Sequence, residues 1–221
     1  MTFAAAQDEV RERFMETLAL FNDIRLHSPE GTAPLDSVQK ARRGLWLVSL
    51  YAAFERGTNA IVEAAISEIA SHEPKSVDCA ASVQSIFHYS KVQAVKDCGL
   101  NAVFDKSKIL LAAAFSDVAL ANLDNPLADR LQNVDASTIM WITGLFGLNS
   151  FTISPPDQGR LGTLRERRNA VAHGREAASQ VGERYMIGEM NNLYNAADRV
   201  ITTFLFSMRD HCTMRHYLRA A

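Results

Sequence analysis

The spacing of apolar residues constrains the fold of this chain more than any other feature of its sequence. Apolar residues recur every three or four positions along most of the 221 residues, and no segment shows the alternation typical of a half-buried strand. The clearest case is an apolar stripe in the last long segment, residues 183–216. It consists of Met186, Met190, Leu193, Ala197, Val200, Phe204 and Met208. We interpret this stripe as a core face and predict an all-α bundle.

The other helices are predicted from the same periodicity and from residues that typically begin or end helices. Asp36 is a typical N-cap, and it precedes the longest helical segment. Loops are expected at 28–34 and 150–159, because both contain two prolines and a glycine. The expected helices cover residues 3 to about 27, about 37–72, about 77–97, 105–123 and 135–147. This pattern predicts a bundle with two long central helices and additional shorter ones.

The second predicted helix is apolar on two sides, which is typical of a helix in the middle of a bundle. One side consists of Leu45, Val48, Ala52, Val62 and Ile66, and the other of Leu47, Leu50, Phe54 and Ile61. Glu55 falls on the first of these sides by its position around the helix. A carboxylate on an apolar face requires a partner, so Glu55 is a candidate for a special role.

Composition and charge indicate an ordinary globular protein. The chain is 48% hydrophobic and 22% charged with a formal net charge of −2, so it can bury a core and carries no overall signal for nucleic-acid binding. We expect one domain over residues 1–221, with 105–150 as an elaboration of it. Three cysteines without CxxC spacing, no secretory signal and no apolar run of about 18 residues favour a reduced, cytoplasmic protein without a membrane span.

The segment LRERRNAVAHGRE, residues 164–176, places a charge where an apolar residue is expected. At about 100° per residue, Arg168 falls on the apolar side of a helix together with Leu164, Val171 and Ala172. A guanidinium stays charged, so Arg168 on this face requires a partner or an interface. The expected helix covers 164–173, with Thr163 as N-cap, Glu166 as its capping-box partner and Gly174 as its stop.

Two further polar residues, Asn169 and His173, lie in the same helix. They are four residues apart and share a face, whereas Arg168 and His173 are about 140° apart around the helix. Arg168 is long and His173 lies at the helix end, so the two could still converge on one ligand, alone or with copies from a second subunit. An imidazole can exchange protons near neutral pH, which suits catalysis. The simpler alternatives are a structural ion pair for Arg168 and no further role for His173.

These residues carry a resemblance to a known family. The run RNAVAHG, residues 168–174, resembles the motif of the HEPN superfamily (higher eukaryotes and prokaryotes nucleotide-binding), which is Arg, four to six residues, and His, usually with a polar residue after the Arg. The run LYAAFERGTNAIV, residues 50–62, is similar to the central helix of defence-associated HEPN proteins, which often carries an aromatic residue and then a Glu. Glu55 and Arg168 are thus opposite charges on two apolar faces, and both are explained if they meet.

The resemblance implies an α-helical dimer that brings two Arg/His motifs face to face. Many HEPN members are metal-independent ribonucleases, often toxins of toxin–antitoxin pairs or phage-defence effectors. Carried over to this chain, His173 would be the acid/base, and Arg168 would hold the scissile phosphate of RNA. Asn169 would orient His173 or contact the phosphate, and Glu55 would hold Arg168 or His173. The 2′-OH of RNA is the nucleophile, so the products would be a 2′,3′-cyclic phosphate and a 5′-OH without metal or cofactor.

Local charge favours an RNA contact beside the motif. Residues 160–184 hold six arginines against three glutamates, and we expect Arg165, Arg167 and Arg175 to bind the RNA backbone. A solvated charged face is the alternative. No metal site is expected, because the histidines are dispersed without HxxxH or HExxH spacing, and His211 and His216 are five residues apart and should not face each other. The glycines in 144–151 are expected to end a helix rather than to bind a phosphate.

Three hypotheses follow for the function. The first is a HEPN-type endoribonuclease that acts as a homodimer, as a toxin or defence effector, with a protein antitoxin or another regulatory partner. The second is a non-catalytic HEPN dimer that binds a nucleotide, an RNA or a protein. The third is a scaffold or toxin partner in which Arg168 and Glu55 form only a buried pair.

Overall fold

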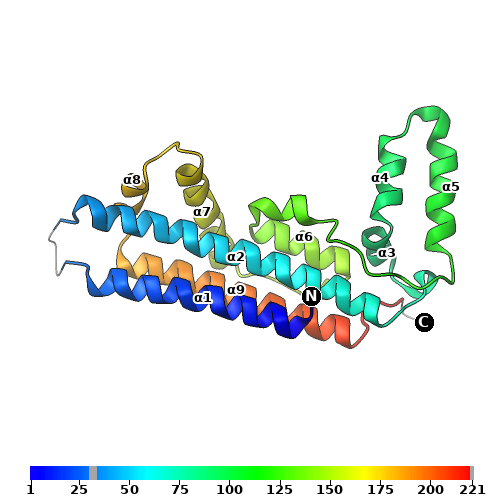
Figure 1. Ribbon diagram of the computed structural model, residues 1–221, viewed down its shortest axis with the longest axis horizontal. Helices are drawn as coiled ribbons and strands as arrows, with labels where there is room; N and C mark the ends of the chain where they lie inside the picture. Colours follow the sequence, from blue (N-terminus) through cyan, green and yellow to red (C-terminus); the bar gives the residue numbers. More distant parts are fainter. Residues whose placement is uncertain (30–33, 220–221) are drawn as a thin grey trace.

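Three long helices form the body of the protein. The computed structural model describes residues 1–29 and 34–219, and within them it contains helices but no β-strand beyond isolated bridges. Helices α1 (Phe3–Leu26), α2 (Ser37–Ser71) and α9 (Ile187–Thr213) lie side by side along the molecule (Figure 1). The all-α prediction is confirmed. Part of the predicted loop at 28–34 lies outside the described residues.

The sequence fixes the start of α2 through its cap. The Asp36 carboxylate accepts a hydrogen bond from the Gln39 N–H at 2.7 Å, and the Gln39 side chain accepts one from the Asp36 N–H at 3.0 Å. This capping box satisfies backbone donors that the first turn leaves open. The predicted N-cap and the predicted length of α2 are therefore confirmed.

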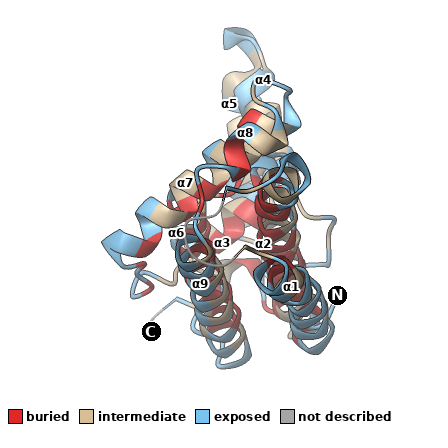
Figure 2. Cartoon of the chain, turned by 90° about the vertical axis from the view of Figure 1, so that its left-hand side faces the viewer, coloured by how far each residue is buried: buried red, intermediate tan, exposed pale blue. Residues whose placement is uncertain are grey.

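Helix α2 is the centre of the core and contacts α1, α7 (Pro155–Ala172), α8 (Ala178–Gly182) and α9. Figure 2 shows the buried residues concentrated in α2 and on the inner faces of its neighbours. The predicted side with Leu47, Leu50, Phe54 and Ile61 is buried throughout. The other side is buried only at Val62 and Ile66, while Leu45 and Ala52 are exposed and Val48 is half-buried. The prediction of a second buried side was therefore wrong for Leu45, Val48 and Ala52.

Two glycines allow α8 to approach α2 closely. A Cβ atom on Gly44 would lie 2.0 Å from the Ala178 carbonyl oxygen, and one on Gly182 would lie 2.0 Å from the Lys40 carbonyl oxygen. Both are backbone atoms that cannot move aside cheaply. Because α8 directly follows the HEPN-like motif, this close contact anchors the chain just beyond the motif.

Helix α7 is longer than predicted, and the prediction of its start was wrong. The helix begins at Pro155 with Ser154 as N-cap, so the two prolines of the expected loop occupy the first helical positions. Proline is favoured there, since its missing N–H would have no partner anyway. Thr163 is inside the helix and donates to the Gly159 carbonyl at 3.0 Å, so neither it nor Glu166 has a capping role. The predicted stop at Gly174, whose φ is +66°, is confirmed.

The region between α2 and α7 differs most from the predictions. The expected helix 77–97 is divided into the turn η1 (Ser76–Asp78), α3 (Ala81–Phe87) and α4 (Tyr89–Asp97), with a break at His88. After the turn η2 (Leu100–Ala102), α5 (Val103–Ala114) is shorter than the expected helix 105–123. Its missing half is extended, because the Ser76 N–H donates to the Val118 carbonyl at 3.0 Å and the Leu120 N–H donates to the Pro74 carbonyl at 2.9 Å.

The remaining elements return the chain to the bundle. The turn η3 (Ala128–Asn133) precedes α6 (Ala136–Phe146), whose limits agree with the predicted helix 135–147. Asp135 is its N-cap, and the helix ends at Gly147, whose φ is +83°, as predicted for these glycines. Helix α9 buries its predicted stripe except Met186, which is its exposed N-cap. On the face of α7 predicted to be apolar, Leu164 is buried but Ala172 is exposed. Among the described helices, none combines the length and hydropathy that a membrane span requires.

Candidate active site

Arg168 lies where α7 crosses α2, beside η3. Its Nη2 atom donates to the Glu55 carboxylate and to the Gln132 carbonyl, the latter at 3.1 Å. The guanidinium also stacks on the ring of Tyr51, with Cζ 4.1 Å from the ring centroid. Only 16% of the Arg168 side chain is exposed. The predicted meeting of Arg168 and Glu55 is therefore confirmed, and it explains both charges on apolar faces.

Burial dominates the electrostatics of Glu55. Burial raises the pKa of Glu55 above its usual value, and the attraction of Arg168 lowers it by less. Tyr51, one turn before Glu55, is fully buried and donates its hydroxyl to the Val134 carbonyl at 3.0 Å. Its pKa is also raised by burial. Tyr51 was not among the predicted site residues, although its spacing of four residues from Glu55 places it on the same helix face.

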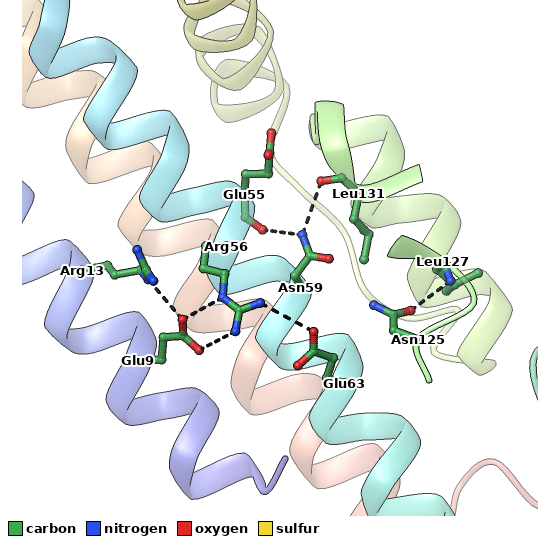
Figure 3. Close-up of polar contacts among 9 residues, drawn as sticks. All are labelled: Glu9, Arg13, Glu55, Arg56, Asn59, Glu63, Asn125, Leu127 and Leu131. Atoms are coloured by element: carbon green, nitrogen blue, oxygen red, sulfur yellow. Dashed lines mark hydrogen bonds and ion pairs between the residues drawn. The ribbon is translucent and has the colours of Figure 1, made fainter. Parts of the chain in front are cut away.

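Successive residues of α2 serve two different neighbours (Figure 3). Asn59 donates to the Glu55 carbonyl at 3.0 Å and to the Leu131 carbonyl at 3.4 Å, which links α2 to η3. Arg56 faces the other way and binds Glu9 of α1, with Nε 2.8 Å from Oε1. The Asn59 contact holds η3 against α2, and η3 in turn supplies the Gln132 carbonyl that Arg168 binds.

His173 and Asn169 occupy the last turn of α7. His173 is the C-cap residue, it is exposed, and its N–H donates to the Asn169 carbonyl at 3.1 Å. The Asn169 Oδ1 atom is buried and has no hydrogen-bond partner among the described residues. A buried acceptor without a donor is unfavourable, and this oxygen keeps its capacity to accept a hydrogen bond.

The predicted RNA-binding arginines differ in how strongly they are engaged. Arg165 binds Asp135, the N-cap of α6. Arg167 donates to the Tyr185 hydroxyl at 3.3 Å and lies 3.9 Å from the Glu176 carboxylate. Arg175 is exposed in the turn after Gly174, and no ion pair involves it within the described part of the chain.

Carboxylates from outside the motif region offset part of its positive charge. Asp135 and Glu55 each bind one arginine of residues 160–184, whereas Asp157 binds Arg160 and, more closely, Arg199. Burial raises the pKa of Asp135, but hydrogen bonds from Ser137 and Thr138 and the charge of Arg165 outweigh it, so the pKa is lowered. Tertiary neighbours thus offset part of the positive charge of residues 160–184.

No cluster of three or more potential metal ligands occurs within residues 1–29 and 34–219. The expectation that His211 and His216 do not face each other was wrong, since their ring centroids are 5.8 Å apart. The chain leaves α9 after Thr213 and reverses at Arg215, whose φ is +58°. His211 is buried, its Nε2 lies 2.8 Å from the Phe146 carbonyl oxygen, and burial lowers its pKa. The contact with the Phe146 carbonyl thus gives the His211 ring a structural role in the core.

The fold and the site together define an all-α protein in which a helix ends in an Arg-Asn-x3-His motif and its Arg is paired to the central helix. A family model described as RiboL-PSP-HEPN matches residues 8–204, and the chain belongs to this HEPN family. No match was found among curated proteins or among solved structures. Membership indicates a ribonuclease-like or nucleotide-binding role, and HEPN domains commonly dimerise and bind RNA.

Proposed function

We propose that the protein is a metal-independent endoribonuclease that acts as a homodimer. The observation that carries this proposal is the placement of Arg168. Its guanidinium is fixed by Glu55, the Gln132 carbonyl and the Tyr51 ring, and both of its hydrogen bonds among the described residues come from Nη2. The Nε and Nη1 donors make no hydrogen bond among the described residues, so each remains to donate to a phosphate oxygen.

The chemistry needs one proton carrier and one cation. An imidazole of His173 takes the proton from the 2′-OH, whose oxygen attacks the adjacent phosphorus. Arg168 stabilises the negative charge that builds on the phosphate oxygens. The 5′ oxygen leaves and takes a proton from an imidazolium of His173, from the same or the second copy. The products are a 2′,3′-cyclic phosphate and a 5′-OH, and no metal or cofactor takes part.

The neighbouring residues support these two groups. We propose that the buried Asn169 Oδ1 accepts a hydrogen bond from the His173 ring when RNA is bound, which would orient the imidazole. Glu55 holds Arg168. Arg175 contributes most to binding the RNA backbone, whereas Arg165 and Arg167 must first exchange their present partners. In the cell, such an activity fits a toxin or a phage-defence effector held in check by an antitoxin protein.

The alternative function is a non-catalytic HEPN dimer that binds a nucleotide, an RNA or a protein partner. The charge balance around the motif favours it, since Asp135 and Glu55 pair with Arg165 and Arg168 and so reduce the positive field that would attract RNA. This alternative does not explain why the exposed His173 follows Arg168 at the spacing of the HEPN motif. The third hypothesis, a scaffold with a merely structural Glu55–Arg168 pair, shares this difficulty.

One comparison separates these functions. Purified protein is incubated with total RNA in EDTA, and His173→Ala is compared with His27→Ala. His27 is a matched control, because it is the C-cap of α1 and is exposed in the same way. We expect wild type and His27→Ala to cleave RNA to 2′,3′-cyclic phosphate ends and His173→Ala to be inactive but folded by circular dichroism. Equal persistence of RNA with wild type and His173→Ala across salt and pH would refute the nuclease proposal.

A further inference from the structure

Helices α4 and α5 form a hairpin that stands away from the bundle, and we call residues 89–115 the arm (Figure 1). Neither helix contains a buried residue, although all of the arm lies in the described part of the chain. The two helices pack mainly on each other. Because the hairpin buries so little of its own apolar surface, a partner that covers this surface would stabilise it.

Several large apolar side chains of the arm are exposed. Phe104, Leu111 and Phe115 follow each other at spacings of seven and four residues, so they share one face of α5. Leu100 precedes them at the tip. The exposed fractions of Leu100 and Phe104 are 89% and 83%. A contiguous apolar surface of this kind on a folded chain typically marks a protein interface.

The arm is also positively charged. It carries four of the six lysines of the chain against two aspartates, Asp97 and Asp105. These lysines are Lys91, Lys96, Lys106 and Lys108. Lys108 lies within the apolar face of α5, four residues after Phe104. A partner surface must therefore combine apolar residues with negative charge.

Helix α6 presents such a surface on the same side of the three long helices as the arm (Figure 1). Met140 and Trp141 are 36% and 43% exposed, and a Cβ atom on Gly144, one turn later, would meet nothing within 4 Å among the described residues. The preceding segment adds two exposed carboxylates, Asp124 and Asp129, and one cation, Arg130, whose Cζ lies 5.7 Å from the centroid of the Trp141 ring, so the surface carries a net negative charge. We call these six residues the acceptor face.

We propose that the arm of one copy docks on the acceptor face of a second copy, and that the reverse contact is made at the same time. Each chain carries both complementary patches, as a two-fold interface requires. Each patch is then used twice, so neither must alone supply the roughly 1,200–2,000 Å² of a stable interface. Pairing of two arms is disfavoured, because it would bring Lys106 and Lys108 of both copies together.

This inference rests on the homodimer of the proposed function but not on RNA cleavage. It also explains how a partner could reach the motif, since Asp135 at the start of α6 binds Arg165 of α7. An arm seated on α6 would lie next to the helix that carries Arg168 and His173.

Charge exchange tests the contact without relying on a variant that fails to fold. Lys106→Glu/Lys108→Glu and Asp124→Lys/Asp129→Lys are made in the full chain, and the dimer dissociation constant is measured by sedimentation velocity. We expect each variant alone to dimerise at least about tenfold more weakly than wild type. Their equimolar mixture should recover wild-type affinity, because both contacts of the mixed dimer then join opposite charges. An unchanged dissociation constant in either variant, or a mixture that recovers no affinity, would overturn the proposal.

Cysteine cross-linking identifies the two surfaces directly. In a Cys98→Ser background, a Phe104→Cys chain is mixed with a Met140→Cys chain and treated with a short bifunctional maleimide. A cross-linked dimer that needs both chains is expected. Cross-linking of Phe104→Cys to itself would show paired arms and overturn the proposal, as would a cross-link within one chain carrying both cysteines. Adding His173→Ala should leave the cross-link intact, so loss of RNA cleavage and loss of docking are measured separately.

Discussion

Two glutamates that each bind an arginine across a helix contact should respond in opposite ways to neutralisation. Glu55 binds Arg168 and Glu9 binds Arg56, and their side chains are 26% and 20% exposed. We expect Glu55→Gln to leave the free energy of unfolding at pH 7 unchanged or slightly higher. Glu9→Gln should lower it by about 1 kcal/mol. The pair is informative because the two variants make the same chemical change in the same bundle.

The opposite responses follow from the pKa shifts. Burial raises the pKa of Glu55 despite Arg168, so the folded protein holds this proton to a higher pH than the unfolded chain does. Ionising Glu55 therefore reduces stability as the pH rises from the unfolded pKa, about 4.3, through the folded one. The hydrogen bond from Arg56 lowers the pKa of Glu9. Its stabilisation is present above the unfolded pKa and is lost as the pH falls through the folded pKa.

The magnitude for Glu9 comes from its contacts. Its carboxylate accepts bonds from Arg56 at 2.8 and 3.3 Å and from Arg13 at 3.2 Å. A hydrogen bond to a charged group contributes about 1.5–3 kcal/mol when buried, and the partial exposure and salt screening here reduce the net loss on neutralisation to about 1 kcal/mol. For Glu55, the penalty of burial exceeds the attraction of Arg168, as the raised pKa indicates, so neutralising this carboxylate removes no net stabilisation.

Urea unfolding at pH 7 and at pH 4 measures both variants against wild type. The deficit of Glu9→Gln should shrink at pH 4, while any gain of Glu55→Gln should disappear there. A loss of 1 kcal/mol or more in Glu55→Gln at pH 7 would refute the balance between burial and attraction. If the balance holds, Glu55 is not retained for stability, and Glu55→Gln should instead reduce RNA cleavage by loosening Arg168.

Three further predictions concern the packing around the site. A double-mutant cycle of Glu55→Ala and Arg168→Ala should give a coupling of about 1–2 kcal/mol by urea unfolding, and additive effects would contradict the contact. Gly44→Ala should destabilise the protein by about 1–3 kcal/mol, because the added methyl group displaces α8 from α2. Gly162→Ala, where a Cβ atom meets nothing within 4 Å, should stabilise it by about 0.5–1 kcal/mol, and equal melting temperatures of the two variants would contradict this. Asp157→Asn should lower the free energy of unfolding by about 2 kcal/mol at pH 7, because hydrogen bonds from its arginines lower the pKa of Asp157. This difference should disappear as the pH falls below about 4, and equal stability of the variant and wild type at pH 7 would contradict it.

Helices with local signals at both ends were predictable from the sequence, and the others were not. Helix α6 has Asp135 before it and Gly147 after it, and both act over a single turn. The start of α7 was not predicted correctly, because proline is common both in loops and in the first turn of a helix, where Pro155 and Pro156 lie. In the arm, apolar periodicity predicted helices correctly but gave wrong limits for them. The backbone hydrogen bond between Ser76 and Val118 joins segments 42 residues apart, and no local sequence pattern predicts it.

The candidate site shows the same division between local and distant causes. The pairing of Glu55 with Arg168 was predictable, since an ionised group on an apolar face must find an opposite charge wherever the chain supplies one. The ion pair of Arg165 was not predictable, for the converse reason. Arginines on a polar face accept any carboxylate that the fold brings near, and Asp135 lies 30 residues from Arg165 in sequence. A charge inside an apolar stripe is therefore strong evidence for a specific contact, whereas the net charge of a sequence window is weak evidence for a surface potential. The case for RNA binding accordingly rests on the guanidinium of Arg168 and the exposed His173, not on the number of arginines around them.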